Sequence, residues 1–121
     1  METDICVIGA GPAGSTLATR LAQLGHEVYL VERSRFPRPR LGESLTPGVL
    51  PLLDVSGARG AIEAAGFPAV EAIDGDWEAT RDRRVGDDGP MGRLVDRGRF
   101  DAILLRHAED AGVHVLQPAS A

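Results

Sequence analysis

Three glycines and one acid form the pattern in this chain that is best suited to binding a ligand. Gly9, Gly11 and Gly14 follow an apolar, β-branched run, and Glu32 closes a second apolar run. Glycine permits a tight turn, a close approach of backbone to ligand, and close packing of a helix on a sheet. A carboxylate at the end of the next strand can accept hydrogen bonds from ribose hydroxyls. The spacing therefore predicts a strand–turn–helix–strand unit that binds a dinucleotide.

The residues between the glycines and the acid predict the helix of this unit. Apolar residues recur at helical spacing from Leu17 to Leu24, and Gly25 ends the pattern. The helix is expected to begin at about Pro12, with its free N–H groups and positive dipole end facing the phosphates. An ordinary βαβ unit, whose glycines only turn the chain and whose acid is solvated, is the alternative. The surrounding pattern favours nucleotide binding.

The acid also bears on the choice of dinucleotide. A carboxylate at Glu32 repels a 2′-phosphate, so FAD or NAD is favoured over NADP, and the fingerprint leaves these two open. Residues 33–40 hold four arginines and two prolines, which predicts an extended connection. This connection passes close to the expected nucleotide, and we expect a phosphate or flavin contact from at least one of its arginines.

The middle of the chain predicts short elements. A helix is expected from Pro47, capped by Thr46, to a break at Ser56-Gly57, and a second helical stretch over 58–65. Short strands are then expected at 69–73 and 76–80, joined by a hairpin turn at Asp74-Gly75. Residues 81–92 are charged and rich in glycine, which indicates a loop, and Leu94-Val95 is expected to return as a strand.

The last elements predict a second crossover back to the parallel sheet. Asp96 can cap a helix with one apolar face, Gly112 ends it, and Val113–Leu116 forms a strand that Pro118 breaks. The expected fold class is α/β. It is a partial Rossmann-like domain with a parallel βαβ unit, a further crossover helix and strand, and a small antiparallel excursion.

Length and composition limit the function classes. The chain has 121 residues and a net charge of −5, which predicts one domain and disfavours nucleic-acid binding. Its one cysteine, Cys6, is expected to be buried in the first strand, and no intramolecular disulfide is possible. No signal peptide or run of transmembrane length is present, so a cytoplasmic protein without a membrane span is expected.

Other patterns for catalysis or metal binding are weak. His26, His107 and His114 lack the spacing of metal ligands, and no cysteine cluster accompanies them, so no metal site is expected. Ser15 and Ser44 lack a recognisable base and a nucleophile elbow. The catalytic residues therefore stay unassigned.

Several longer motifs resemble the N-terminal part of FAD-dependent monooxygenases. The group is the para-hydroxybenzoate-hydroxylase-like superfamily, which includes the flavin-dependent halogenases and geranylgeranyl reductases. The resemblance covers essentially the whole chain. Its Gly-Glu-Ser segment and arginine-led helix are more specific than the glycine turn, and they favour FAD over NAD. The motifs that carry it are residues 4–15, Val31-Glu32-Arg33, Phe36-Pro37-Arg38, Gly42-Glu43-Ser44-Leu45, Val95–Asp101 and Val113–Ala119.

The resemblance implies a place along FAD for each candidate residue. The glycine loop would cradle the pyrophosphate, Glu32 would hold the adenosine ribose, and Arg33 would lie beside the adenine or phosphates. Residues 42–44 would lie along the middle of the cofactor, which Arg97 would reach from its helix start. The expected FAD-binding residues are Gly9, Gly11, Pro12, Ala13, Gly14, Glu32, Arg33, Gly42, Glu43, Ser44 and Arg97.

The resemblance also implies an activity. Such enzymes reduce FAD with NAD(P)H and use O2 to oxygenate a small organic substrate or, in halogenases, halide. All thirteen basic residues here are arginine, and the halogenase lysine and Trp-x-Trp-x-x-Pro segment are absent. A monooxygenase or hydroxylase is therefore ranked above a halogenase-like or geranylgeranyl-reductase-like protein.

The family's later FAD motifs and most of its substrate domain are also absent from this sequence. Residues 1–121 are thus expected to be an N-terminal FAD-binding fragment, incomplete for catalysis, with 67–95 as the start of a substrate-domain-like β excursion. A non-catalytic adenine-nucleotide-binding remnant and an NAD-binding dehydrogenase fragment stay open as alternatives. Three parallel strands without the rest of their sheet leave an edge and an apolar face uncovered, so self-association is expected.

Overall fold

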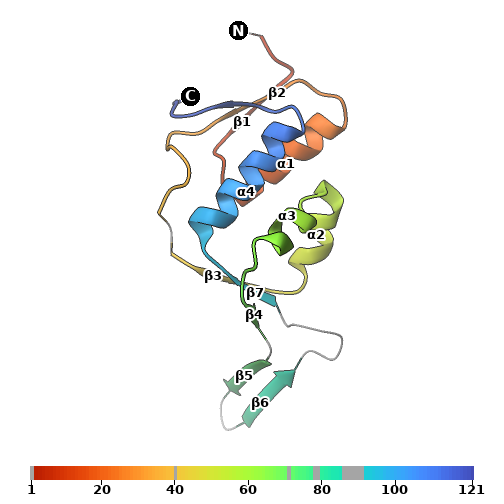
Figure 1. Cartoon of the computed structure of the whole chain (residues 1–121), viewed down its shortest axis with the longest axis vertical. Coiled ribbons are helices and arrows are strands. Elements are labelled where there is room, and N and C mark those ends of the chain that lie inside the picture. Colours follow the sequence, from red (N-terminus) through yellow and green to blue (C-terminus); the bar gives the residue numbers. More distant parts are fainter. Residues whose placement is uncertain (1, 40, 71, 78–79, 86–91) are drawn as a thin grey trace.

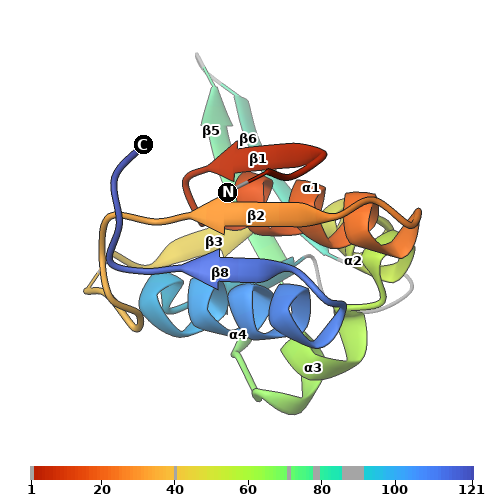
Figure 2. The same cartoon turned by 90° about the horizontal axis from the view of Figure 1, so that it is seen from above.

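A three-stranded parallel sheet with two helices on one face forms the main body of the computed structural model. The structure describes residues 2–39, 41–70, 72–77, 80–85 and 92–121, with side chains described outside 71–91. The strands β1 (Ile5–Ile8), β2 (Val28–Val31) and β8 (His114–Leu116) lie in the order β1-β2-β8, all parallel. Figures 1 and 2 show the helices α1 (Pro12–Gln23) and α4 (Arg97–Asp110) side by side on the same face of this sheet. The predicted α/β class is confirmed.

The main core lies between this sheet and its two helices. Every second strand residue faces the helices, so Val7 and Leu30 are buried against Ala18 of α1 and Ala108 of α4. The alanines are small, which lets both helices approach the sheet closely. Each large apolar side chain buried here stabilises the fold by about 1.5–3 kcal/mol.

The opposite face of the parallel sheet carries no helix from the described part of the chain (Figure 2). Ile8 is 71% exposed on this side, and the Tyr29 and His114 rings stack with their centroids 4.6 Å apart. Cys6 is exposed, so its predicted burial is wrong. The physical reason is strand alternation, which gives the inward position to Val7 and turns its neighbours outward.

A second, antiparallel sheet follows the connection after β2. It contains β3 (Glu43–Leu45), β7 (Gly92–Val95) and β4 (Ala69–Val70) in the order β3-β7-β4. The expected strand at 94–95 is thus present and begins earlier. The small excursion predicted from the sequence is confirmed, although its strands differ in detail.

Two short helices, α2 (Val49–Ser56) and α3 (Arg59–Ala64), pack on α4 beside the second sheet. Their core centres on Leu53 and Ile62, which pack with Phe100 of α4. α2 begins later than predicted, because Gly48 is its N-cap and no side chain caps it. Thr46 takes part through its backbone instead, since its carbonyl accepts a hydrogen bond from the Val49 N–H at 3.1 Å.

A hairpin of β5 (Ala72–Trp77) and β6 (Thr80–Val85) extends beyond the second sheet (Figure 1). The predicted turn at Asp74-Gly75 is wrong, because both residues lie within β5. The register pairs Asp74 with Arg83 and Asp76 with Arg81. The predicted loop over 81–92 is a strand up to Val85, and 86–91 lie outside the described residues.

None of the helices in the described ranges is long and apolar enough to cross a membrane.

Candidate cofactor-binding site

The glycine loop turns sharply between β1 and α1. Gly9 has a φ of +97°, which residues with a side chain rarely adopt. A Cβ on Gly14 would overlap the carbonyl oxygen of Gly9, so only glycine lets the helix pack against this turn. α1 begins at Pro12 with Gly11 as its N-cap, and no side chain caps its first turn. Such a helix end presents N–H groups and a positive dipole to an anion.

The space beside Gly11 opens into a cavity of about 480 Å³. A Cβ on Gly11 would meet only Nη2 of Arg38, at an ordinary contact distance of 3.8 Å. The fold would therefore tolerate a methyl group at position 11. Because Gly11 carries none, the space beside it is open to a ligand. The cavity is lined by Ile8, Gly9, Gly11, Val31, Glu32, Arg33, Arg38, Ala119, Ser120 and Ala121.

Glu32 is buried at the end of β2 and accepts hydrogen bonds from three donors. Its Oε2 accepts from the Ala10 N–H at 2.8 Å, and its Oε1 accepts from the Ser34 N–H at 2.9 Å and from Arg38 Nη1 at 3.2 Å. Burial alone would raise the pKa of Glu32. The two backbone hydrogen bonds and the charges of Arg38 and Arg33 outweigh burial and lower that pKa below its usual value. The carboxylate is therefore charged at neutral pH.

Arg38 lies between the glycine loop and α4. Its guanidinium carbon stacks over the Phe36 ring at 4.6 Å, and its Nη2 lies 3.5 Å from Oδ2 of Asp101. Its Nε is buried and has no hydrogen-bond partner among the residues that the structure describes. Arg38 thus brings a largely buried positive charge to the edge of the cavity beside Gly11.

The second group of predicted residues lies around Arg97, at the N-terminus of α4. Arg97 donates through Nε and Nη2 to Asp101 at 2.8 and 3.2 Å, and through Nη1 to Glu43 at 2.7 Å. Hydrogen bonding to Asp101 raises the pKa of the Arg97 guanidinium above its ordinary value. Glu43 is thereby tied to α4. A cavity of about 560 Å³ on this side is lined by Gly42, Glu43, Ser44, Leu94, Val95 and Asp96.

The structure thus divides the predicted site residues between two places. Gly9, Gly11, Glu32 and Arg33 line the first cavity, and Pro12, Ala13 and Gly14 follow Gly11 at the start of α1. Residues 42–44 and Arg97 lie around the second.

Two residues join these places: Arg38, one of the four arginines from which a phosphate or flavin contact was expected, and Asp101, which was not predicted. One sequence signal for Asp101 existed, namely an acid four residues after Arg97 on a helix, a spacing that favours an ion pair.

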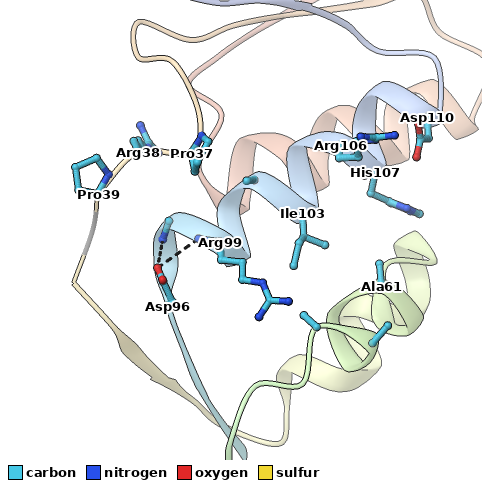
Figure 3. Close-up of a pocket in the computed structure, with 14 residues that line it drawn as sticks. Pro37, Arg38, Pro39, Ala61, Asp96, Arg99, Ile103, Arg106, His107 and Asp110 are labelled. Carbon is cyan, nitrogen blue, oxygen red and sulfur yellow. Dashed lines mark hydrogen bonds between the residues drawn. The ribbon is translucent and has the colours of Figure 1, made fainter.

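A third cavity, of about 990 Å³, lies between residues 37–39, α3 and α4 (Figure 3). Its lining includes Ala61, Arg99, Ile103 and Arg106, and none of the predicted FAD-binding residues lines it. It has no glycine turn and no uncapped helix start, because Asp96 accepts hydrogen bonds from the Gly98 and Arg99 amides at the start of α4. The glycine turn and the uncapped helix start that a nucleotide site is expected to have therefore lie at the first cavity.

No group of three or more metal-ligating side chains is present within the described residues.

The sequence of this chain matches a known protein family over almost its whole length. The profile of the FAD binding domain family matches residues 2–120. The chain belongs to this FAD-binding family. The predicted resemblance to FAD-dependent enzymes is confirmed, and FAD is the cofactor. The residues around the first cavity fit FAD. The start of α1 has no side-chain cap, Gly11 leaves open space beside it, and the charged Glu32 lines the same cavity.

The similar proteins include halogenases and a monooxygenase. Tryptophan 2-halogenase of Chondromyces crocatus is 44% identical over 120 residues, which cover 96% of this chain and 23% of the relative. The 6-methylpretetramide 4-monooxygenase of Streptomyces rimosus is 45% identical over 87 residues, which cover 63% and 21%. The solved structure of the myxobacterial chondrochloren halogenase CndH superposes with a TM-score of 0.84 at 38% identity, covering 96% and 28%. The chain spans about a quarter of the length of these proteins.

Proposed function

We propose that this chain is the FAD-binding N-terminal part of a flavin-dependent halogenase. The observation that carries the proposal is similarity to halogenases over 96% of the chain, both in sequence and in structure. The 6-methylpretetramide 4-monooxygenase matches 63% of the chain, and a solved peptidyl tryptophan dihydroxylase matches 96% of it at 32% identity, below the 38% of the halogenase CndH. In the complete protein, FAD reduced by NAD(P)H would supply electrons to O2, and the oxidised halide would replace a hydrogen of a small organic substrate.

This proposal reverses the ranking drawn from the sequence alone. That ranking placed a monooxygenase first because the chain has no lysine and no Trp-x-Trp-x-x-Pro segment. A chain that spans 23% of a halogenase is not required to contain every halogenase residue. The proposal rests on similarity over the FAD-binding part, and it assigns no halogenase lysine to this chain.

The residues of the first cavity would bind the adenosine and pyrophosphate of FAD. Backbone N–H groups at the start of α1 would hold the pyrophosphate beside Gly11. A carboxylate offers about four acceptor positions, and three of those on Glu32 are occupied by Ala10, Ser34 and Arg38. The remaining position of Glu32 would accept one ribose hydroxyl.

The residues of the second cavity would lie along the middle of the cofactor. Gly42, Glu43 and Ser44 line this cavity, and Arg97 fixes Glu43 through a hydrogen bond of 2.7 Å. We also propose that residues 67–95, which include the β5–β6 hairpin, begin the substrate domain.

A product analysis tests the proposed function. The complete protein is incubated with FAD, a flavin reductase, NADH, O2 and chloride or bromide, together with small aromatic substrates, and products are identified by mass spectrometry. A halogenated product is expected. An oxygenated product without halogen would support the monooxygenase alternative, and FAD binding without turnover would support a non-catalytic remnant.

A further inference from the structure

Asp101 is a buried acid that the proposed function does not yet use. It lies on α4 with 0% of its surface exposed. Its Oδ1 accepts from Arg97 Nε at 2.8 Å, its Oδ2 accepts from Arg97 Nη2 at 3.2 Å, and Oδ2 also lies 3.5 Å from Arg38 Nη2. A buried carboxylate is costly unless it is paired, so these two arginines account for its presence in the core.

The two arginines that Asp101 holds belong to different halves of the site. Arg38 reaches Glu32 at 3.2 Å and borders the space beside Gly11, where the pyrophosphate is expected. Arg97 reaches Glu43 at 2.7 Å, on the side where the middle of the cofactor is expected. A continuous line of ion pairs therefore runs from the first cavity, through Asp101, to the second.

Arg38 requires such a partner because few other contacts fix it. Its side chain is long and loses much conformational freedom when ordered, and its Nε has no hydrogen-bond partner among the described residues. Within the part of the chain that the structure describes, the Phe36 ring and Glu32 are the other contacts that hold the guanidinium, besides Asp101. The backbone at Arg38 also packs closely against the start of α4, since a Cβ on Gly98 of α4 would lie only 2.6 Å from the Arg38 carbonyl oxygen.

We propose that Asp101 is a positioning residue for FAD, which sets Arg38 at the pyrophosphate end and Arg97 at the Gly42–Ser44 end. The inference rests on the FAD site described above. Without the Asp101 charge, Arg38 is free to donate a second hydrogen bond to Glu32. It then occupies the acceptor position that the ribose hydroxyl requires, and its charge moves away from the phosphates.

Calorimetric titration with ADP and with FAD, well below the unfolding temperature, tests this role. ADP contains only the adenosine and pyrophosphate, so it reports on the first cavity alone. Asp101→Asn is expected to weaken ADP binding about tenfold and FAD binding by more. Arg97→Gln is expected to weaken FAD binding more than ADP binding. The matched control is Asp110→Asn, which makes the same charge change at an exposed position of α4 and leaves both affinities as they are.

A double-mutant cycle separates positioning from a general loss of stability. In an Arg38→Gln background, Asp101→Asn is expected to cause no further loss of ADP affinity, because the residue it positions is gone. Additive losses would overturn the proposal, as would wild-type ADP affinity in Asp101→Asn.

A second variant, Arg38→Lys, and the wild-type protein test the proposal independently of whether Asp101→Asn folds. If Asp101→Asn does not fold, Arg38→Lys replaces it, because an ammonium keeps the charge but cannot contact Glu32 and Asp101 together. The same loss of ADP affinity at an unchanged unfolding temperature supports the proposal, and unchanged affinity overturns it. Wild-type protein that binds neither ADP nor FAD overturns the FAD-binding proposal as well, which distinguishes the two failures.

Discussion

Oε2 of Glu32 accepts a hydrogen bond from the backbone N–H of Ala10 at 2.8 Å, so the end of β2 holds the start of the glycine loop. The other oxygen, Oε1, accepts from Ser34 and Arg38, which fixes the connection that leaves β2. One acid therefore shapes the cavity on two sides and, in the proposed FAD site, would also offer an acceptor to the ribose. Its removal is expected to affect the fold and the cofactor together.

Glu32→Gln removes the charge and turns one acceptor oxygen into a donor NH2 group. Either the Ala10 amide or the Ser34 amide and Arg38 then lose their partner in a buried place. We expect the free energy of unfolding to fall by about 1–3 kcal/mol and FAD affinity to fall at least about tenfold. Denaturant unfolding and calorimetric titration measure the two effects. Glu27→Gln, at an exposed position, is the control and is expected to change neither.

Gly11→Ala is expected to separate cofactor binding from folding. Its Cβ would meet only Arg38 Nη2 at 3.8 Å, so the unfolding temperature is expected to stay within a few degrees of the wild type. In the proposed FAD site the methyl group would occupy the space where the pyrophosphate approaches the backbone, so ADP and FAD affinities are expected to fall more than about tenfold. Unchanged affinity for both ligands would place the pyrophosphate elsewhere.

Gly14→Ala and Gly60→Ala serve as comparisons for Gly11→Ala, one in a tightly packed place and one in an open place. A Cβ on Gly14 overlaps the Gly9 carbonyl, and we expect a loss of more than about 2 kcal/mol in stability or failure to fold. Gly60, on α3, has no neighbour within 4 Å of an added Cβ. Gly60→Ala is expected to raise stability by about 0.5–1 kcal/mol and to leave FAD binding unchanged.

The pKa of Glu32 sets a pH window. Because the folded state lowers this pKa below its ordinary value of 4.5, the charged acid stabilises the fold fully above that value. The stabilisation is lost as pH falls from 4.5 through the lower pKa of the folded protein. Unfolding free energies measured over this acid range are therefore expected to fall more steeply in the wild type than in Glu32→Gln. Parallel curves would assign the acid sensitivity to other groups.

The uncovered face of the parallel sheet predicts self-association. Ile8 is 71% exposed on this face, and Cys6 is exposed beside it on the edge strand β1. Sedimentation velocity in the presence of reductant is expected to show a concentration-dependent increase in mass. Cys6→Lys places a charge on this face and is expected to reduce that association. A wild-type monomer at all concentrations would contradict the prediction.

The elements with the strongest local patterns were predictable from sequence. The apolar runs around residues 5–8 and 28–31, and the helix capped by Asp96, lie where their patterns placed them. Local chemistry dominates there, because a glycine turn or a capping acid acts on its own neighbours. The turn predicted at Asp74-Gly75 failed for the opposite reason, since the pairing of β5 with β6 overrode a local turn signal.

The difference between local patterns and contacts made by the fold also explains which residues of the candidate site were predictable. Glycine roles follow from backbone geometry and were visible in the sequence, as was the acid at the end of β2. Arg38 was one of four arginines in a single connection, and only the fold shows which of them meets Asp101. Cys6 was misplaced because periodicity does not say which face of a strand is covered.

Equilibrium titration of the purified protein with FAD and, separately, with NAD tests the central claim most directly. Changes in flavin absorbance or fluorescence follow FAD, and calorimetry follows both ligands. The account predicts saturable binding of FAD that is tighter than that of NAD, and its loss in Gly11→Ala. Protein that binds no FAD, or that binds NAD as tightly as FAD, would contradict it.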